Sequence, residues 1–239
     1  MDPADHLRWL ATDASAFLDV LEVGQLTAPV PGCPGWTLAD LAAHLGTVHR
    51  WARLAVLEGP TTEPAEVPSG RSALCAWWRD GASALHKTLT QTSPDAACWT
   101  MAPPGEVRYW MRRQAHETAL HRWDAQQSQG AAHAIDPVLA ADGVAEVVEM
   151  FFPRQVRLGR TRSLRHRLHL RIDGGATHTL AGNGAGSAPA EQPVDAVVGG
   201  PPEALLLLLW RRTTLDDPRL RHSGSREAAA TVLDAGLTP

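Results

Sequence analysis

MRRQAHETALHRWDA, residues 111–125, has the composition of a helix. Within it, Glu117 and His121 are four residues apart. Residues at positions i and i+4 lie on one face of a helix. A carboxylate and an imidazole placed together are two of the three protein ligands that an open zinc site uses. The stretch therefore predicts a helix that offers two metal ligands, and the third ligand has to come from another element.

His44 is the upstream candidate for the third ligand, in the segment TLADLAAHLGTVHRWARL, residues 37–54. Thr37 and Asp40 are spaced as a capping box, so we expect a helix to begin at Thr37 and to run to about Glu58. Helical bundles build metal sites from inward side chains on facing helices. Asp124, about one turn after His121, is placed to accept a hydrogen bond from the second ring nitrogen of a ligating histidine.

Other histidines lie near both helices but fit the site less well. His116 points about 100° away from Glu117 around the helix axis. His49 lies five residues after His44 and is also off its face. A Glu-x-x-x-His pair also occurs in helices as a simple side-chain pair, so the spacing alone leaves both interpretations open.

The remainder of the chain predicts an α+β protein with two domains. An up-down four-helix bundle is expected from four helical segments, which begin at Pro3, Thr37, about residue 70 and about Glu106. A further helix follows Asp136 and runs to about Met150. Alternating apolar residues then predict strands over 164–172, 176–182 and 194–200, and two helices follow, over 201–212 and 225–236. We place the domains at 1–157 and 158–239.

Composition excludes several classes of protein. Apolar residues make up 44% and charged residues 20%, as in an ordinary globular protein, and the net charge of −4 argues against a nucleic-acid-binding surface. Three cysteines are too few for a disulfide framework. The N-terminus lacks the basic region and apolar core of a signal peptide, and the longest apolar run, Ala204–Trp210, is too short to span a membrane. We expect a cytoplasmic monomer with no membrane or nucleic-acid partner.

Two motifs together resemble a known family. The pairing of PGCPGWTLADLAAHL, residues 31–45, with RRQAHETALHRWDA, residues 112–125, is similar to the mycothiol-dependent maleylpyruvate isomerases, which are DinB-like metal-binding bundles. VDAVVGGPPEALLLLLWRR, residues 194–212, resembles the second domain of that family, a small fold similar to sterol carrier proteins. The resemblance covers nearly the whole chain.

The resemblance implies a ligand set and a chemistry. The metal ligands of the family map onto His44, Glu117 and His121, and the implied cofactors are a divalent metal, Zn²⁺, and mycothiol as the thiol cosubstrate. A metal-bound thiolate would add to the cis double bond of maleylpyruvate, and its elimination after rotation would leave the trans isomer. The family also uses an arginine that faces the substrate. It maps by position onto Arg212, but Arg211 replaces the glycine that commonly precedes it, so which of the two faces the site stays open.

Two further functions remain open from the sequence. If the thiol adduct is kept, the protein is a mycothiol S-transferase that acts on an electrophilic metabolite or toxin. If the metal is inactive or structural, it is a non-catalytic protein that binds small molecules. A structural zinc site is normally closed by four protein ligands, and only three are assigned here, which favours catalysis. The expected partners are a small electrophilic or carboxylate substrate and a low-molecular-weight thiol.

Overall fold

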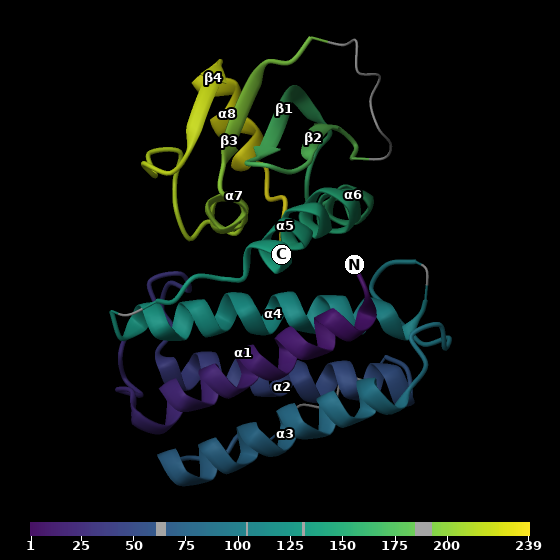
Figure 1. The fold of residues 1–239 in the computed structure, drawn as a ribbon, viewed down its shortest axis with the longest axis vertical. Helices are drawn as coiled ribbons and strands as arrows, with labels where there is room; N and C mark the ends of the chain where they lie inside the picture. The colour runs from purple at the N-terminus through teal and green to yellow at the C-terminus, as the bar shows by residue number, and fades with distance from the viewer. Residues whose placement is uncertain (61–65, 104, 131, 185–192) are drawn as a thin grey trace. The chain divides into compact units, whose positions relative to one another are not determined.

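The chain forms two units, shown as a ribbon in Figure 1. A computed structural model describes residues 1–60, 66–103, 105–130, 132–184 and 193–239. The first unit spans Met1–Ile135 and the second spans Asp136–Pro239, and each is described by itself. In the described part of the chain, no helix combines the length and the apolar character that crossing a membrane requires.

Four long helices make up the first unit: α1 (Pro3–Val23), α2 (Leu38–Leu57), α3 (Arg71–Gln91) and α4 (Val107–Ser128). Local sequence sets several of their ends. The Asp2 carboxylate accepts a hydrogen bond from the Ala4 N–H and caps α1, with Pro3 in the first turn. Gly130, at a φ of 77°, follows the end of α4. The four-helix bundle predicted from the sequence is confirmed.

The order of neighbours in the bundle does not follow the order of the chain. Helix α1 packs mainly against α4 and α3, and α2 packs mainly against α3 and α4. Consecutive helices α1 and α2 therefore lie on a diagonal, as do α3 and α4. The connections after α1 and after α3 are long enough to cross that diagonal, whereas a short loop would join adjacent antiparallel helices. This order makes α2 and α4 neighbours along the face where the predicted ligands lie.

An apolar core and one buried ion pair hold the bundle together. The rings of Phe17 and Trp78 stack with their centroids 4.8 Å apart, and both side chains are buried. Leucines from α1 and α2 complete this core, among them Leu21, Leu41 and Leu45. Between α1 and α4, the buried Arg122 donates a hydrogen bond from Nε to Asp13 Oδ1 at 3.0 Å. Burial of the apolar side chains provides the main driving force for assembly.

The second unit combines helices with a mixed sheet. It contains α5 (Pro137–Glu146), a π-helical turn η1 (Val147–Phe151), α6 (Phe152–Arg157), β1 (Leu164–Ile172), β2 (Thr177–Gly182), β3 (Ala196–Gly200), α7 (Pro202–Leu209), β4 (Arg221–Gly224) and α8 (Arg226–Leu233). The strand order is β2-β1-β3-β4, with β1 and β3 parallel and the outer pairs antiparallel. Helix α8 packs on β1 and β3, and α7 packs on α5 through a fully buried leucine run. The predicted α+β fold is confirmed.

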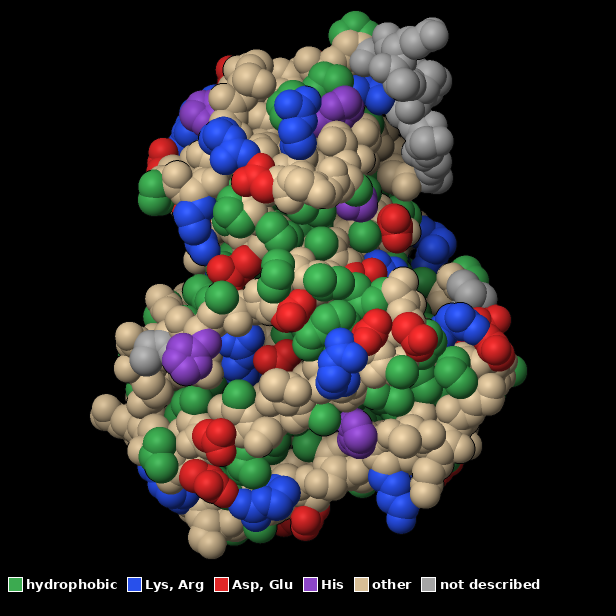
Figure 2. Space-filling view, viewed as in Figure 1, with side chains coloured by type: hydrophobic (Ala, Val, Ile, Leu, Met, Phe, Trp, Pro, Cys, Tyr) green, Lys and Arg blue, Asp and Glu red, His purple; other side chains and the backbone are tan. Residues whose placement is uncertain are grey.

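The structure differs from the sequence prediction in detail. The domain boundary predicted at 157/158 falls inside the second unit, because α5, η1 and α6 belong with the sheet. In the sequence these helices simply continue a helical run, which is why the prediction assigned them to the bundle. Strand β4 was not predicted, since all four of its residues are exposed and show no apolar alternation. On the face seen in Figure 2, acidic and basic side chains are interspersed.

Candidate metal centre

The structure brings together the three side chains that the sequence predicted as ligands. The Oε1 atom of Glu117 lies 3.4 Å from Nε2 of His44 and 3.4 Å from Nε2 of His121. The ligand atoms of these three residues all lie within 4.8 Å of one another. The imidazole rings of His44 and His121 meet edge to face, with centroids 5.2 Å apart. Two nitrogens and a carboxylate oxygen thus converge on one point from α2 and α4.

Local structure fixes the position of His44. The Thr37 hydroxyl accepts a hydrogen bond from the Asp40 N–H, and the Asp40 carboxylate accepts one from the Thr37 N–H at 2.9 Å, so the predicted capping box is present. This box sets where α2 begins, and His44 follows two turns later. The indole of Trp36 lies against the imidazole of His44, with ring centroids 4.8 Å apart.

Arg113 holds the second oxygen of Glu117. Its guanidinium, one turn earlier on α4, donates a hydrogen bond to Oε2 at 2.9 Å, and the Arg113 side chain is only 3% exposed. Oε2 is therefore engaged, and Oε1 faces the two histidines. Burial disfavours ionisation of Glu117, but hydrogen bonds from His121 and His44 and the charge of Arg113 outweigh it and hold the pKa of this carboxyl well below its ordinary value. Glu117 is a carboxylate ready to ligate a cation.

Asp124 orients His121 from the other side. Its Oδ2 atom lies 2.9 Å from Nδ1 of His121, and Asp124 is fully buried. This contact keeps the proton on Nδ1 and leaves the lone pair of Nε2 for a metal, as outer carboxylates do in zinc sites. Burial disfavours a protonated ring, but hydrogen bonds with Asp124 and Cys33 and the Glu117 carboxylate raise the pKa of His121 well above its ordinary value. A cation bound at Nε2 of His121 would replace the proton on that nitrogen.

The site opens on the side of His44. The side chain of His44 is 36% exposed, that of Glu117 16% and that of His121 9%. Two ligands are therefore buried on α4, while the ligand on α2 borders solvent. A small molecule can approach a metal from this side, and no fourth protein ligand was assigned from the sequence. An accessible three-ligand set is typical of catalytic rather than structural zinc sites.

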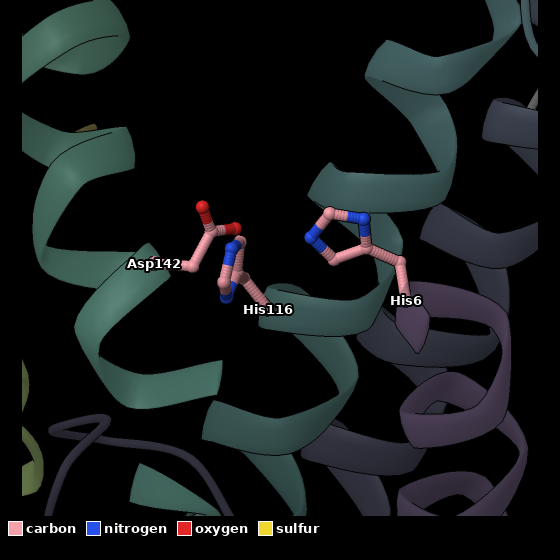
Figure 3. A group of neighbouring side chains, drawn as sticks. All are labelled: His6, His116 and Asp142. Carbon is pink, nitrogen blue, oxygen red and sulfur yellow. The ribbon is translucent and has the colours of Figure 1, made fainter. Parts of the chain in front are cut away.

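The histidines that the sequence set aside lie in other environments. His49 is fully buried, with Nε2 2.9 Å from the Thr118 hydroxyl, and burial lowers its pKa to about 3. Figure 3 shows His116 on α4 and His6 on α1, whose rings meet edge to face with centroids 6.0 Å apart. Figure 3 also labels Asp142, a residue of α5 in the second unit. His116 thus faces α1 rather than the ligand group, as its position on the helix predicts.

The two predicted catalytic arginines belong to the second unit, at the end of α7. Arg211 has a φ of 60° and donates a hydrogen bond from its guanidinium to the Asp234 carbonyl at 3.1 Å. It also lines a pocket of about 360 Å³ together with Thr213, Asp216 and Arg226. Arg212 donates to the Trp210 carbonyl at 2.8 Å. The catalytic role of either arginine stays a prediction.

Two residues near the site were given no role in it from the sequence. Arg113 precedes Glu117 by four positions, and that spacing is a signal for an ion pair on one helix face. Cys33 donates to Asp124 Oδ2 at 3.7 Å, although the two residues are 91 positions apart. No local pattern indicates that contact, because it depends on how the loop before α2 folds against α4.

Comparison with known proteins identifies both halves of the chain. Residues 7–126 match the family model described as the mycothiol maleylpyruvate isomerase N-terminal domain, and residues 138–231 match the model described as the MDMPI C-terminal domain. An uncharacterized protein of Mycobacterium tuberculosis, found in strains H37Rv and CDC 1551, is 28% identical over 162 residues, which cover 64% of this chain and 82% of that protein.

Solved structures share the fold. The crystal structure of the mycothiol-dependent maleylpyruvate isomerase superposes with a TM-score of 0.67 at 14% identity, over 93% of both chains. The crystal structure of a histidine-to-alanine mutant of the mycothiol-dependent maleylpyruvate isomerase gives a TM-score of 0.62 at 14% identity, over 87% of this chain and 88% of the other. At this identity the likeness establishes the fold.

Proposed function

Because the chain belongs to the mycothiol maleylpyruvate isomerase family, we propose that it is a cytoplasmic, metal- and mycothiol-dependent enzyme that isomerises a substrate of the maleylpyruvate type. The observation that carries the proposal is the convergence of His44, Glu117 and His121, with ligand atoms within 4.8 Å of one another and one ligand at the surface. Two imidazoles and a carboxylate suit Zn²⁺, which takes three such ligands in catalytic sites.

The donor set fits a bound divalent ion. Glu117 is ionised and its Oε1 faces both histidines, while the contact of Asp124 with Nδ1 leaves Nε2 of His121 as the nitrogen that a cation can bind in place of a proton. A divalent ion held by His44, Glu117 and His121 would lower the pKa of a thiol that binds it, which supplies a thiolate near neutral pH. The buried Arg113 and Asp124 keep the ligands in place, so little reorganisation is needed when the cation binds.

The proposed reaction needs a nucleophile and a site for the substrate's carboxylates. The mycothiol thiolate adds to one carbon of the cis double bond, a C–S bond forms, and the π electrons move onto the conjugated carbonyl. Rotation about the resulting single bond follows. When the electrons return, the C–S bond breaks, the trans double bond forms and the thiolate leaves. We propose that Arg212 binds a substrate carboxylate, since a guanidinium can hold one through two hydrogen bonds.

Metal content and isomerase activity together test the proposal. We expect His44→Ala and His121→Ala to lose the divalent metal held by this ligand group and most activity with mycothiol and maleylpyruvate. The matched control is His86→Ala, on α3 and outside the ligand group, which should retain both. Full metal occupancy in both ligand variants would rule out the site.

Two further arms of the assay separate the remaining alternatives. Arg212→Ala should lower activity while metal is retained, and a loss of activity caused by Arg211→Ala alone would assign the role to that arginine instead.

Product analysis distinguishes the outcomes of the thiol step. A trans isomer with no net consumption of mycothiol supports an isomerase, whereas a stable thioether that accumulates identifies a thiol S-transferase. If the protein binds metal but turns over no electrophile in a panel, it is a non-catalytic binding protein.

A further inference from the structure

We propose that Cys33, Asp124 and the Nδ1 edge of His121 form a second cation site, selective for a thiophilic divalent ion such as Zn²⁺ or Cd²⁺. The Sγ of Cys33, a carboxylate oxygen of Asp124 and a ring nitrogen of His121 all lie within 4.8 Å of one another. Within this group, Cys33 Sγ is 3.7 Å and His121 Nδ1 is 2.9 Å from Asp124 Oδ2. The isomerase activity is not needed for this site.

The two sites use opposite edges of one imidazole ring. Nε2 of His121 faces Glu117, 3.4 Å from Oε1, on the side of the ligand group with His44. Nδ1 faces Asp124 on the other side. The geometry therefore gives His121 a separate partner set at each nitrogen, and the second set contains a thiol that the first lacks.

The elements that carry the second site hold it rigidly. Asp124 and His121 lie one turn apart on α4 and are buried, with Asp124 fully enclosed. Cys33 lies in a tight turn before α2: its N–H donates to the Val30 carbonyl and its own carbonyl accepts from the Trp36 N–H, both at 3.0 Å. Cys33 is half-buried, at the border between solvent and the buried Asp124. The turn fixes the backbone on both sides of the thiol.

The donor chemistry selects the kind of ion. One thiolate, one carboxylate and one imidazole are ligands for borderline-soft cations, whereas Mg²⁺ and Ca²⁺ prefer sites made of oxygen alone. On binding, the ion replaces the thiol proton of Cys33 and the proton on Nδ1 of His121, and both protons leave to solvent. The negative charges of the thiolate and of Asp124 then balance the two positive charges of the ion. An ion in this position also takes over the contact by which Asp124 orients His121.

Titration of the metal-free protein with Cd²⁺, without added thiol, tests the site. A bond between Cys33 and cadmium produces an ultraviolet sulfur-to-cadmium charge-transfer band, which nitrogen and oxygen ligands do not give. We expect the band to saturate at one sulfur-bound Cd²⁺ per chain, to be lost in Cys33→Ser, and to persist in Cys75→Ser and Cys98→Ser. Asp124→Asn should weaken binding of the sulfur-bound ion. The unchanged cysteine controls exclude a signal from the other two thiols.

His44→Ala separates this site from the proposed catalytic site. In that variant the first ligand group is incomplete, yet the charge-transfer band should keep its full amplitude. If the wild-type protein shows no such band, or if Cys33→Ser retains it, the second site is overturned. The isomerase proposal would stand in either case. If Cys33→Ser does not fold, alkylation of the wild-type protein decides. Bound Cd²⁺ should protect the peptide that contains Cys33, and equal labelling with and without Cd²⁺ would refute the site.

Discussion

Arg211 is a residue in a conformation that suits glycine better. Among the described residues other than glycine, it is the only one with a positive φ, at 60°. The N–H of Arg211 donates to the Leu208 carbonyl and the N–H of Arg212 donates to the Leu207 carbonyl, at 3.0 and 2.8 Å. This pair of bonds is a Schellman motif, which ends α7 with a left-handed residue. This backbone geometry would also suit the glycine that the family resemblance implies at this position.

We expect Arg211→Gly to stabilise the protein by about 1 kcal/mol, because glycine adopts a positive φ without the clash that a Cβ atom causes. The hydrogen bond from Arg211 to the Asp234 carbonyl is exposed, so its loss should offset little of this gain. Urea unfolding measures the change. Arg212→Gly, one position later, is the control and should give no gain. If Arg211→Gly is less stable than the wild-type protein, the positive φ of Arg211 does not strain the backbone.

His49 should make the stability of the protein fall in mild acid. Burial is the main reason that its pKa drops from 6.5 to about 3 in the folded chain. Between these values the unfolded chain binds a proton that the folded chain does not, so the free energy of unfolding decreases as pH falls, by up to about 1.4 kcal/mol per pH unit. Above about pH 6.5 this dependence disappears.

Comparison with His49→Gln isolates this effect, since glutamine does not titrate. The free energy of unfolding should fall more steeply from pH 6.5 to pH 4 in the wild-type protein than in the variant, as measured by denaturant unfolding at each pH. Other titrating groups are common to both proteins and cancel in the difference. Parallel pH profiles would show that the pKa of His49 is the same in the folded and unfolded chains.

The three predicted ligands lie together for a local reason. Glu117 and His121 share a helix face by spacing alone, and a capping box fixes where the helix of His44 begins. Distances between separate helices have no such local code. The contact of Cys33 with Asp124, which joins a loop to α4, became visible only in the folded chain.

At the scale of elements, the cap of α2 sets where a ligand lies. Thr37 and Asp40 exchange hydrogen bonds between their side chains and backbone N–H groups. We expect Thr37→Ala to cost about 1 kcal/mol of stability, the usual effect of removing such a cap. Urea unfolding followed by circular dichroism measures it. The control is Thr47→Ala in the middle of the same helix, which should cost little because alanine favours helix. Equal losses would show that the cap contributes nothing.

Elements with a strong local signal were predicted, and those without one were not. Apolar periodicity and end signals fit α1 to α4, and alternation fits β1. Strand β4 is exposed along its length and gains its place by pairing with β3. The π-helical turn η1 interrupts a continuous helical pattern, and α6 extends beyond the end predicted at Met150. These features arise from packing, which a single stretch of sequence does not record.

At the scale of the whole molecule, the predicted metal ligands and the predicted catalytic arginines lie in different units. All three ligands belong to Met1–Ile135, which has its own apolar core, and Arg212 belongs to Asp136–Pro239. We expect a fragment of residues 1–135 to fold as a helical protein and to bind one divalent metal at the ligand group, but to lack isomerase activity because it has no Arg212.

Circular dichroism, metal analysis and the isomerase assay check this fragment, with His44→Ala in the fragment as the control that should lose the metal bound at the ligand group. Metal binding by the fragment without turnover would support the proposal that the first unit binds the metal and that the second supplies Arg212. An unfolded fragment would show that the second unit is needed for the bundle to form. Full isomerase activity would show that Arg212 is not required.

The pairing of the first helix with the fourth has a consequence for how the protein is made. Helix α1 packs mainly on α3 and α4, and the Asp13–Arg122 ion pair joins residues 109 positions apart. A ribosome releases α1 long before α4. The apolar face of α1 therefore stays without its main packing partner until α4 has been synthesised. Glu117 and His121 arrive on that last helix. A growing chain could therefore bind metal at this ligand group only after α4 has packed into the bundle.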